Sequence, residues 1–90
     1  MDKDQYWVYG LVSEIQHRIY VGLSDNPKKR VKSHNKGDTK STKGYRPWIL
    51  FYREFIGKLE DARQREKYLK SGSGKEFLKK ELKRLRHIPE

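Results

Sequence analysis

The sequence predicts an α+β domain, a small three-stranded antiparallel sheet flanked by helices in the order ββαβαα. Three observations support this class. Aromatic and β-branched residues gather in three short runs, helical spacing recurs in two C-terminal segments, and capping or breaking residues bound a third helix and most other segments. Ninety residues suffice for one modest core. We therefore expect a single domain over residues 1–90, with its core at about 6–82 and a helix end and tail at 83–90.

Three runs of residues predict the strands. The first two, residues 6–12 and 18–23, are rich in aromatic and β-branched side chains and flank a polar connector, so they predict a β-hairpin. Residues 48–55 have the same character and predict the third strand. Gly22 interrupts the second run, and glycine inside a strand often marks the close approach of a ligand or backbone.

The first predicted helix has clear start and stop signals. Asn26 provides a capping side chain, Pro27 suits the first helical position, and Gly37 stands where a helix would end. A helix is therefore expected over Pro27–Lys36. Residues 37–46 are small, polar or basic apart from Tyr45, and we expect them to form an exposed loop that is mobile without substrate.

Two further helices are expected in the C-terminal third. Residues 59–70 have helical spacing and are followed by the sequence Ser-Gly-Ser-Gly at 71–74, which is expected to break the helix. After Lys75, apolar residues again recur at helical intervals, which predicts a basic amphipathic helix. Residues 87–90 are expected to fray.

Charge and composition limit the possible partners. The chain has a formal charge of +10, and residues 63–86 hold ten basic and three acidic residues, a net +7. Such a field attracts phosphate polyanions, so nucleic acid is favoured over a merely solvated helix surface or an anionic membrane. The absence of cysteine excludes thiolate metal sites and fits a reducing cytoplasm. The apolar stretch at 6–12 is too short for a signal segment or a membrane span.

Glu66 is the first candidate for a chemical role. At 100° per residue, it shares one stripe of its helix with Leu59, Ala62 and Leu69. A carboxylate on an apolar stripe needs a cation, a hydrogen-bond donor or a wet cleft. Taken alone, a structural ion pair with a Lys or Arg is the favoured interpretation, and metal ligation is the alternative.

A second group of candidates comes from the first helix and the hairpin. Arg30 and His34 lie one helical turn apart, so their side chains can converge on one phosphate, although a solvated basic helix is an equally good interpretation. Tyr9 and Tyr20 fall in adjacent strands, where cross-strand distances could bring both hydroxyls to one sheet edge, although strand tyrosines usually serve packing.

Taken together, these residues resemble a known family. The order Trp7-Val8-Tyr9, Tyr20-Val21-Gly22, Arg30, His34 and Glu66, with the basic segment 41–48 between them, is similar to the GIY-YIG endonuclease domain over residues 6–82. The closest likeness is to small stand-alone bacterial members related to the N-terminal nuclease domain of the excision-repair endonuclease. Trp7 stands where the family's first Gly would be.

The resemblance implies a metal-dependent DNA endonuclease with a GIY-YIG nuclease fold, serving DNA repair or recombination. It implies that Tyr9 and Tyr20 position or deprotonate the attacking water, that Arg30 contacts the scissile phosphate, and that His34 shares in proton transfer. Glu66 would hold one divalent ion, Mg²⁺ or Mn²⁺. Whether Tyr9 or His34 is the main proton acceptor stays open.

DNA contacts are expected from the basic loop and the C-terminal helices. The residues expected to bind DNA are Lys40, Lys43, Tyr45, Arg46, Lys70 and Lys75. A domain this small has little surface for sequence readout, so we expect low specificity, with targeting left to a partner protein. The alternatives are a non-catalytic binding module of the same fold, with Tyr45 and Trp48 stacking on bases, and an RNA-associated or ribosome-associated basic protein.

Overall fold

The predicted fold class and element order are confirmed by the computed structural model, which describes residues 4–86. Residues 87–90, expected to fray, lie outside the described part. The elements are β1 (Tyr6–Ser13), β2 (Ile19–Ser24), α1 (Pro27–Lys36), α2 (Lys40–Lys43), β3 (Trp48–Gly57), α3 (Leu59–Lys70) and α4 (Gly72–Arg86). Apart from the short α2, the order is the expected ββαβαα.

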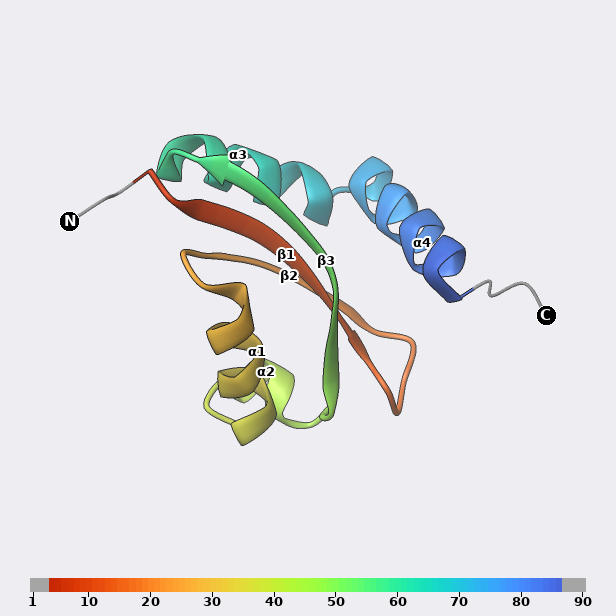
Figure 1. The fold of residues 1–90 in the computed structure, drawn as a ribbon. Coiled ribbons are helices and arrows are strands. Elements are labelled where there is room, and N and C mark those ends of the chain that lie inside the picture. Colours follow the sequence, from red (N-terminus) through yellow and green to blue (C-terminus); the bar gives the residue numbers. More distant parts are fainter. Residues whose placement is uncertain (1–3, 87–90) are drawn as a thin grey trace.

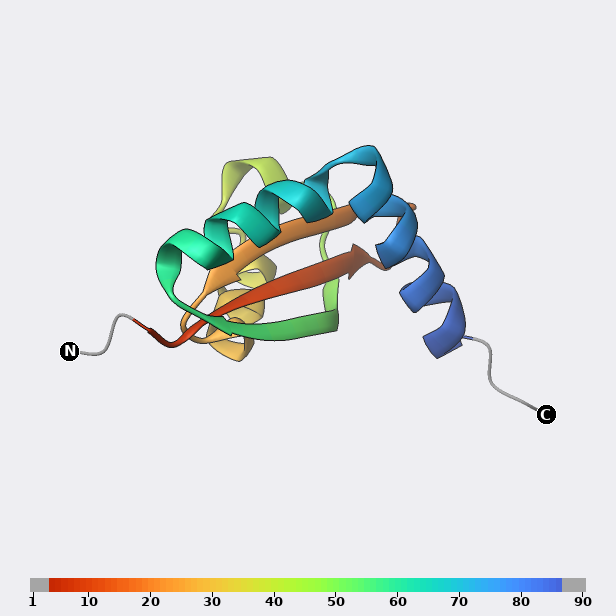
Figure 2. The same ribbon diagram turned by 90° about the horizontal axis from the view of Figure 1, so that it is seen from above.

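The sheet has the strand order β2-β1-β3 and is antiparallel throughout. β1 is central, and β2 is an edge strand. In the register of β1 and β2, Tyr9 pairs with Gly22 and Leu11 pairs with Tyr20. Since side chains alternate along a strand, Tyr9 and Tyr20 point to the same face. Helices α1 and α2 cover this face, and α3 and α4 cover the other (Figures 1 and 2).

The face beneath α3 and α4, here called the α3–α4 face, has an apolar core. Its buried members come from two strands and both helices, and they are Val8, Val21, Ala62, Leu69 and Leu78. Ala62 and Leu69 belong to the predicted inward stripe of α3. Burial of these side chains contributes roughly 25 cal/mol per Å² of apolar surface removed from water.

The opposite face, here called the α1–α2 face, has a mixed core. Tyr9, Leu11 and Trp48 form its hydrophobic cluster, and His34 and Thr42 are buried beside them. A buried imidazole and a buried hydroxyl cost free energy unless each is hydrogen-bonded. The polar groups of this face are therefore tied into a network, described below.

Helix α1 begins and ends as its sequence signals predict. The Asn26 side chain accepts a hydrogen bond from the Lys29 amide at 3.1 Å, and Pro27 occupies the first helical position. Gly37 ends the helix with φ +88°, a left-handed conformation that suits glycine. These local signals fix the helix that carries Arg30 and His34.

The expectation of an irregular exposed loop before β3 is wrong for Lys40–Lys43, which form α2. Thr42 is buried, and its carbonyl accepts a hydrogen bond from the Trp48 indole at 2.8 Å. Asn35 anchors the other end, since its side-chain oxygen accepts from the Trp48 amide at 2.6 Å. Tertiary hydrogen bonds, which composition does not reveal, order this segment.

The break between the last two helices is shorter than expected. α3 ends at Lys70 as predicted, but α4 begins at Gly72, inside the segment expected to be a linker. A Cβ at Gly74 would overlap the backbone of Tyr68 and Leu69. Gly74 therefore allows α4 to pack directly against the end of α3, and it is not a flexible hinge.

Candidate active site

The hydroxyl of Tyr9 lies at the centre of the candidate site. It is 3.2 Å from Nε2 of His34, and both residues are buried on the α1–α2 face. The Tyr9 ring extends from central β1 across edge strand β2 and lies over Gly22. A Cβ at Gly22 would be only 2.6 Å from the Tyr9 hydroxyl oxygen. Gly22 therefore makes room for a side chain, which corrects the expectation that it admits a ligand or backbone.

His34 is fixed by a second hydrogen bond behind Tyr9. Its Nδ1 is 2.9 Å from Oγ1 of Thr42, and this hydroxyl also donates to the Thr39 carbonyl at 3.3 Å. Because the only hydroxyl proton of Thr42 is used in that bond, Oγ1 accepts from an Nδ1–H group. Nε2 is then the unprotonated nitrogen and accepts from the Tyr9 hydroxyl. In this network, the Nδ1–H tautomer of His34 satisfies all three contacts.

Arg30 supplies the positive charge of this group. It lies one helical turn before His34, as the spacing predicts, and is partly exposed. Burial lowers the pKa of His34, and the Arg30 charge lowers it further. Burial also raises the pKa of the Tyr9 hydroxyl, while a hydrogen bond and positive charge from Arg30 oppose that rise. Near pH 7, the site therefore holds a neutral phenol, a neutral imidazole and one cation.

Tyr20 completes the group on this face. Its ring contacts His34 edge-on with centroids 4.8 Å apart, and its centroid is 6.4 Å from that of Tyr9. Tyr20 is partly exposed, whereas Tyr9 and His34 are buried. The structure therefore brings together Tyr9, Tyr20, Arg30 and His34, with Tyr20 and Arg30 at the solvent side.

Glu66 approaches from the opposite face. Helix α3 packs along edge strand β2. Glu66 is a half-buried residue of α3, as its place on the predicted apolar stripe implies. Its negative charge is close enough to contribute to the raised pKa of Tyr9. Oε2 is 3.2 Å from Nζ of Lys70, whose side chain is 53% exposed. The ion pair considered from sequence therefore exists, but it lies at the surface, where such pairs contribute little to stability.

The donor set tests whether a divalent metal fits. Among residues 4–86, no cluster of three or more His, Asp or Glu side chains forms a complete cage. Mg²⁺ does not need one, because it keeps several waters and usually takes one or two carboxylates together with substrate phosphates. A single half-buried carboxylate at an open edge fits that pattern. Glu66 is the residue that would hold the ion.

The residues expected to bind DNA divide into two sets. Tyr45, Lys70 and Lys75 line one cavity of about 380 Å³ along β2, here called the β2 cavity. Lys40, Lys43 and Arg46 are exposed on α2 and just after it, outside the lining of this cavity.

Trp48 is mainly a core residue, although it contributes to the lining of the β2 cavity. Trp48 is only 4% exposed, and its indole N–H donates to the protein backbone. Its hydrophobic ring packs in the core of the α1–α2 face.

Sequence reasoning missed Thr42 and Arg18. Thr42 lies in a segment of small, polar and basic residues with no periodicity, so nothing in the sequence marks it as buried against His34. The sequence predicts that Arg18 begins the second strand, but Arg18 precedes β2 in the structure. Its guanidinium lies 4.4 Å from the centroid of the Tyr45 ring. Only the three-dimensional arrangement reveals either contact.

Comparison with known proteins defines the class. Residues 5–81 match the GIY-YIG catalytic domain, a nuclease-type domain. The chain belongs to the GIY-YIG family. No solved structure matches significantly.

Two small UPF0213 proteins are similar to this chain. A UPF0213 protein of Clostridium perfringens is 42% identical over 53 residues, which cover 58% of this chain and 57% of that protein. A UPF0213 protein of Staphylococcus haemolyticus is 33% identical over 76 residues, which cover 83% of this chain and 92% of that protein. Within the described residues, no helix is long and apolar enough to cross a membrane.

Proposed function

We propose that this protein is an endonuclease that hydrolyses DNA phosphodiester bonds with one Mg²⁺ or Mn²⁺ ion held at Glu66. The observation that carries the proposal is the hydrogen-bonded series of Tyr9, His34 and Thr42, set beside Arg30 at the edge of the sheet. A buried, fully paired imidazole with a defined tautomer costs more to build than an apolar core. Such a group is expected where proton transfer is needed.

Arg30 binds the scissile phosphate in this proposal. Its planar guanidinium keeps its charge at any working pH and offers parallel N–H donors to two phosphate oxygens. Arg30 is partly exposed and its charge affects the pKa values of Tyr9 and His34, so a phosphate bound to Arg30 would lie near the proton-transfer pair. The guanidinium would offset the charge that develops on the non-bridging oxygens.

Tyr9 and His34 receive the proton of the attacking water. The Tyr9 hydroxyl lies over Gly22 at the edge strand and donates to Nε2 of His34. As Tyr9 takes the water's proton, its own proton passes to Nε2, and Thr42 holds Nδ1–H in place. Partly exposed Tyr20 orients the water. This assignment makes Tyr9 and His34 a pair, and neither acts alone.

Glu66 would hold the divalent ion at the open edge, beside Tyr9. When bound, the ion supplies Lewis-acid stabilisation of the leaving oxygen. Lys70, paired with Glu66 at 3.2 Å, would be released to the DNA backbone when the carboxylate takes a different partner. The expected setting is DNA repair or recombination, with low sequence specificity and targeting by a partner protein.

A nicking assay tests this proposal. Supercoiled and branched DNA would be incubated with the protein in Mg²⁺, in Mn²⁺ and in EDTA, alongside Tyr9→Phe and Tyr52→Phe variants prepared identically. Tyr52 is a matched control, because its hydroxyl donates to Glu54 on β3, away from the site. We expect metal-dependent cleavage that Tyr9→Phe loses and Tyr52→Phe keeps. Equal cleavage by both variants, or none by the wild type, would reject the proposal.

A further inference from the structure

The β2 cavity shares walls with the candidate active site. Tyr20 lines it on one side, and Lys70, which lies 3.2 Å from Glu66, lines it on the other. The cavity therefore adjoins Tyr20 and the Glu66–Lys70 ion pair, whereas Tyr9 and Arg30 are not part of its lining. An occupant of the cavity would lie next to Tyr20, a solvent-side member of the candidate active site, and next to Lys70, the partner of Glu66.

The lining of the cavity combines planar groups with cations. Tyr20 and Tyr45 contribute rings, and the Arg18 guanidinium lies over the Tyr45 ring at 4.4 Å. Arg18 is exposed, so its outer face is open to a second planar group. Lys70 and Lys75 provide ammonium groups from α3 and α4. Planar surfaces stack on bases, and ammonium groups pair with phosphates, so the lining matches a nucleotide.

We propose that the β2 cavity binds one unpaired nucleotide next to the scissile phosphate. The preferred substrate is then DNA with an unpaired nucleotide at the cleavage point, such as a single strand or a flap, in preference to continuous duplex. This inference rests on the proposed nuclease function. A base inside a duplex must be unstacked before it can enter, which costs free energy, whereas an unpaired base enters without that cost.

A second cavity continues the path away from the catalytic group. It has a volume of about 350 Å³, shares Arg18 and Lys75 with the β2 cavity, and adds His17 and Lys79. Lysine and arginine side chains placed along such a groove track a nucleic-acid backbone. The bound strand would therefore run along edge strand β2 from Gly22 toward the β1–β2 connection, between the two helical layers.

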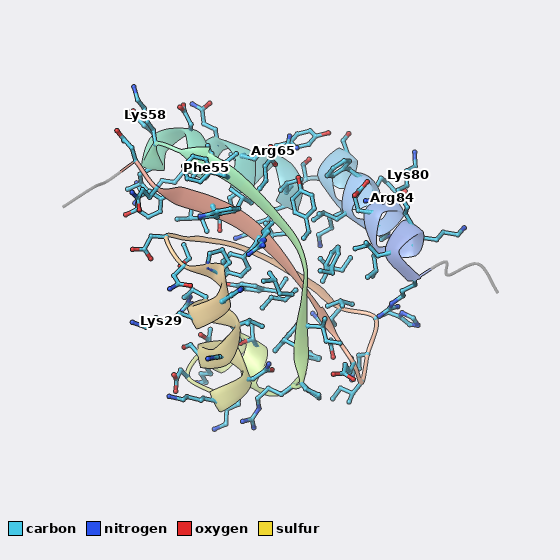
Figure 3. All side chains as sticks on the ribbon, in the orientation of Figure 1. Lys29, Phe55, Lys58, Arg65, Lys80 and Arg84 are labelled. Carbon is cyan, nitrogen blue, oxygen red and sulfur yellow. The ribbon has the colours of Figure 1, made fainter. Side chains whose placement is uncertain are left out.

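Two alanine variants test the cavity directly. Tyr45→Ala removes a ring from the lining. Tyr68→Ala is the matched control, because Tyr68 is 44% exposed on α3 and lies outside the cavity, with its ring centroid 5.2 Å from the guanidinium of Arg65 (labelled in Figure 3). Since Tyr45 also packs against Trp48, Lys75→Ala on the exposed side of α4 serves as a second variant that leaves the core intact.

Binding would be measured by fluorescence anisotropy in EDTA, and cleavage by single-turnover assay in Mn²⁺. The substrates are a labelled duplex, the same duplex with a one-nucleotide bulge, the single strand, and that strand with abasic sites placed one at a time. We expect the wild type to prefer unpaired substrates by about tenfold. One abasic position beside the cut should remove the preference. Tyr45→Ala and Lys75→Ala should reduce it, and Tyr68→Ala should retain it.

Several results would overturn the inference. Equal binding of duplex and unpaired DNA, equal losses in the Tyr45 and Tyr68 variants, or tighter binding of the matching RNA strand would each do so. The two proposals fail separately. Cleavage without substrate preference would support the nuclease activity and reject the role of the cavity. A Tyr45-dependent binding preference without any cleavage would support the role of the cavity and reject the nuclease activity.

Discussion

The two faces of the sheet are built from different chemistry. On the α3–α4 face, the buried residues Val8, Val21 and Leu78 and their neighbours are apolar. On the α1–α2 face, a phenol, an imidazole and a threonine hydroxyl are buried and bonded to one another. Removing water from a polar group costs free energy unless the group is hydrogen-bonded, so this face depends on its hydrogen-bond network.

This difference separates stability from function. The α3–α4 face follows ordinary packing rules, so changes there should reduce stability and leave the activity of folded molecules unchanged. The α1–α2 face keeps polar groups that an apolar core would not need, so changes there should reduce activity more than stability. Glu66 is the exception, because it extends from α3 toward the chemistry of the other face.

The largest expected effect is on stability. Gly74→Ala places a Cβ against the backbone of Tyr68 and Leu69, which cannot move independently of α3. We expect a loss of about 3 kcal/mol or more, enough to unfold a marginal domain. Gly72→Ala is the control, since a Cβ there would meet nothing within 4 Å. Equal denaturation midpoints for the two variants would show that the helices do not pack as described.

The second-largest expected effect is on the rate of cleavage. Arg30→Lys replaces a planar fork with a point charge, so we expect single-turnover cleavage to fall by about 10²-fold while melting and bulk DNA affinity stay nearly unchanged. Arg63→Lys, at an exposed position of α3, should have no effect. A wild-type cleavage rate for Arg30→Lys would show that Arg30 is a surface charge with no catalytic role.

A smaller effect is expected from the hydroxyl behind His34. Thr42→Val removes the acceptor of Nδ1–H and the donor to the Thr39 carbonyl, so the tautomer of His34 is no longer fixed. We expect cleavage to fall by about tenfold, as for other groups that orient a functional imidazole. Thr42→Ser keeps the hydroxyl and should restore most of the rate. If serine fails to do so, the methyl packing of Thr42 matters and its hydroxyl does not.

The smallest effect is a pH dependence of stability. The folded-state pKa of His34 is lowered by burial and by Arg30. The unfolded chain binds a proton at this position as pH falls through about 6.5, whereas the folded protein resists until its lower pKa. The stabilisation is therefore complete above about pH 6.5 and is lost as pH falls through the folded-state value.

Melting curves between pH 7 and pH 5 in EDTA measure this contribution. Wild type should lose stability across the range, and His34→Gln should lose less. His17→Gln, at an exposed position, should behave like the wild type. An unchanged slope in the His34 variant would mean that other groups carry the pH dependence.

Local signals explain how much of the fold could be predicted from the sequence. Asn26, Pro27 and Gly37 define α1 through contacts within a few residues, and each signal was interpreted correctly. α2 and the start of α4 were missed because their causes are tertiary. Thr42 is held by Trp48, and Gly74 is required by the backbone of α3.

The candidate site divides in the same way. Helical spacing indicated that Arg30 and His34 can converge on one point, and strand pairing indicated that the hydroxyls of Tyr9 and Tyr20 could reach one sheet edge; the structure places the two pairs close together. The exposure of Lys70, which makes the Glu66 ion pair a surface pair, depends on how α3 lies along β2 and could not be predicted from spacing. The sequence therefore indicates which residues lie close together, and the packing of the helices determines which of them are exposed to solvent.

The central claim is that Glu66 serves a metal ion and not the fold. Glu66→Gln keeps the shape of the side chain and removes its charge. Because Lys70 is 53% exposed, losing its partner strands no buried cation, and we expect a stability change below about 1 kcal/mol. The melting temperature should stay nearly unchanged while Mn²⁺-dependent cleavage is abolished. Strong destabilisation of Glu66→Gln, with no metal-dependent cleavage or thermal shift in the wild type, would contradict the account.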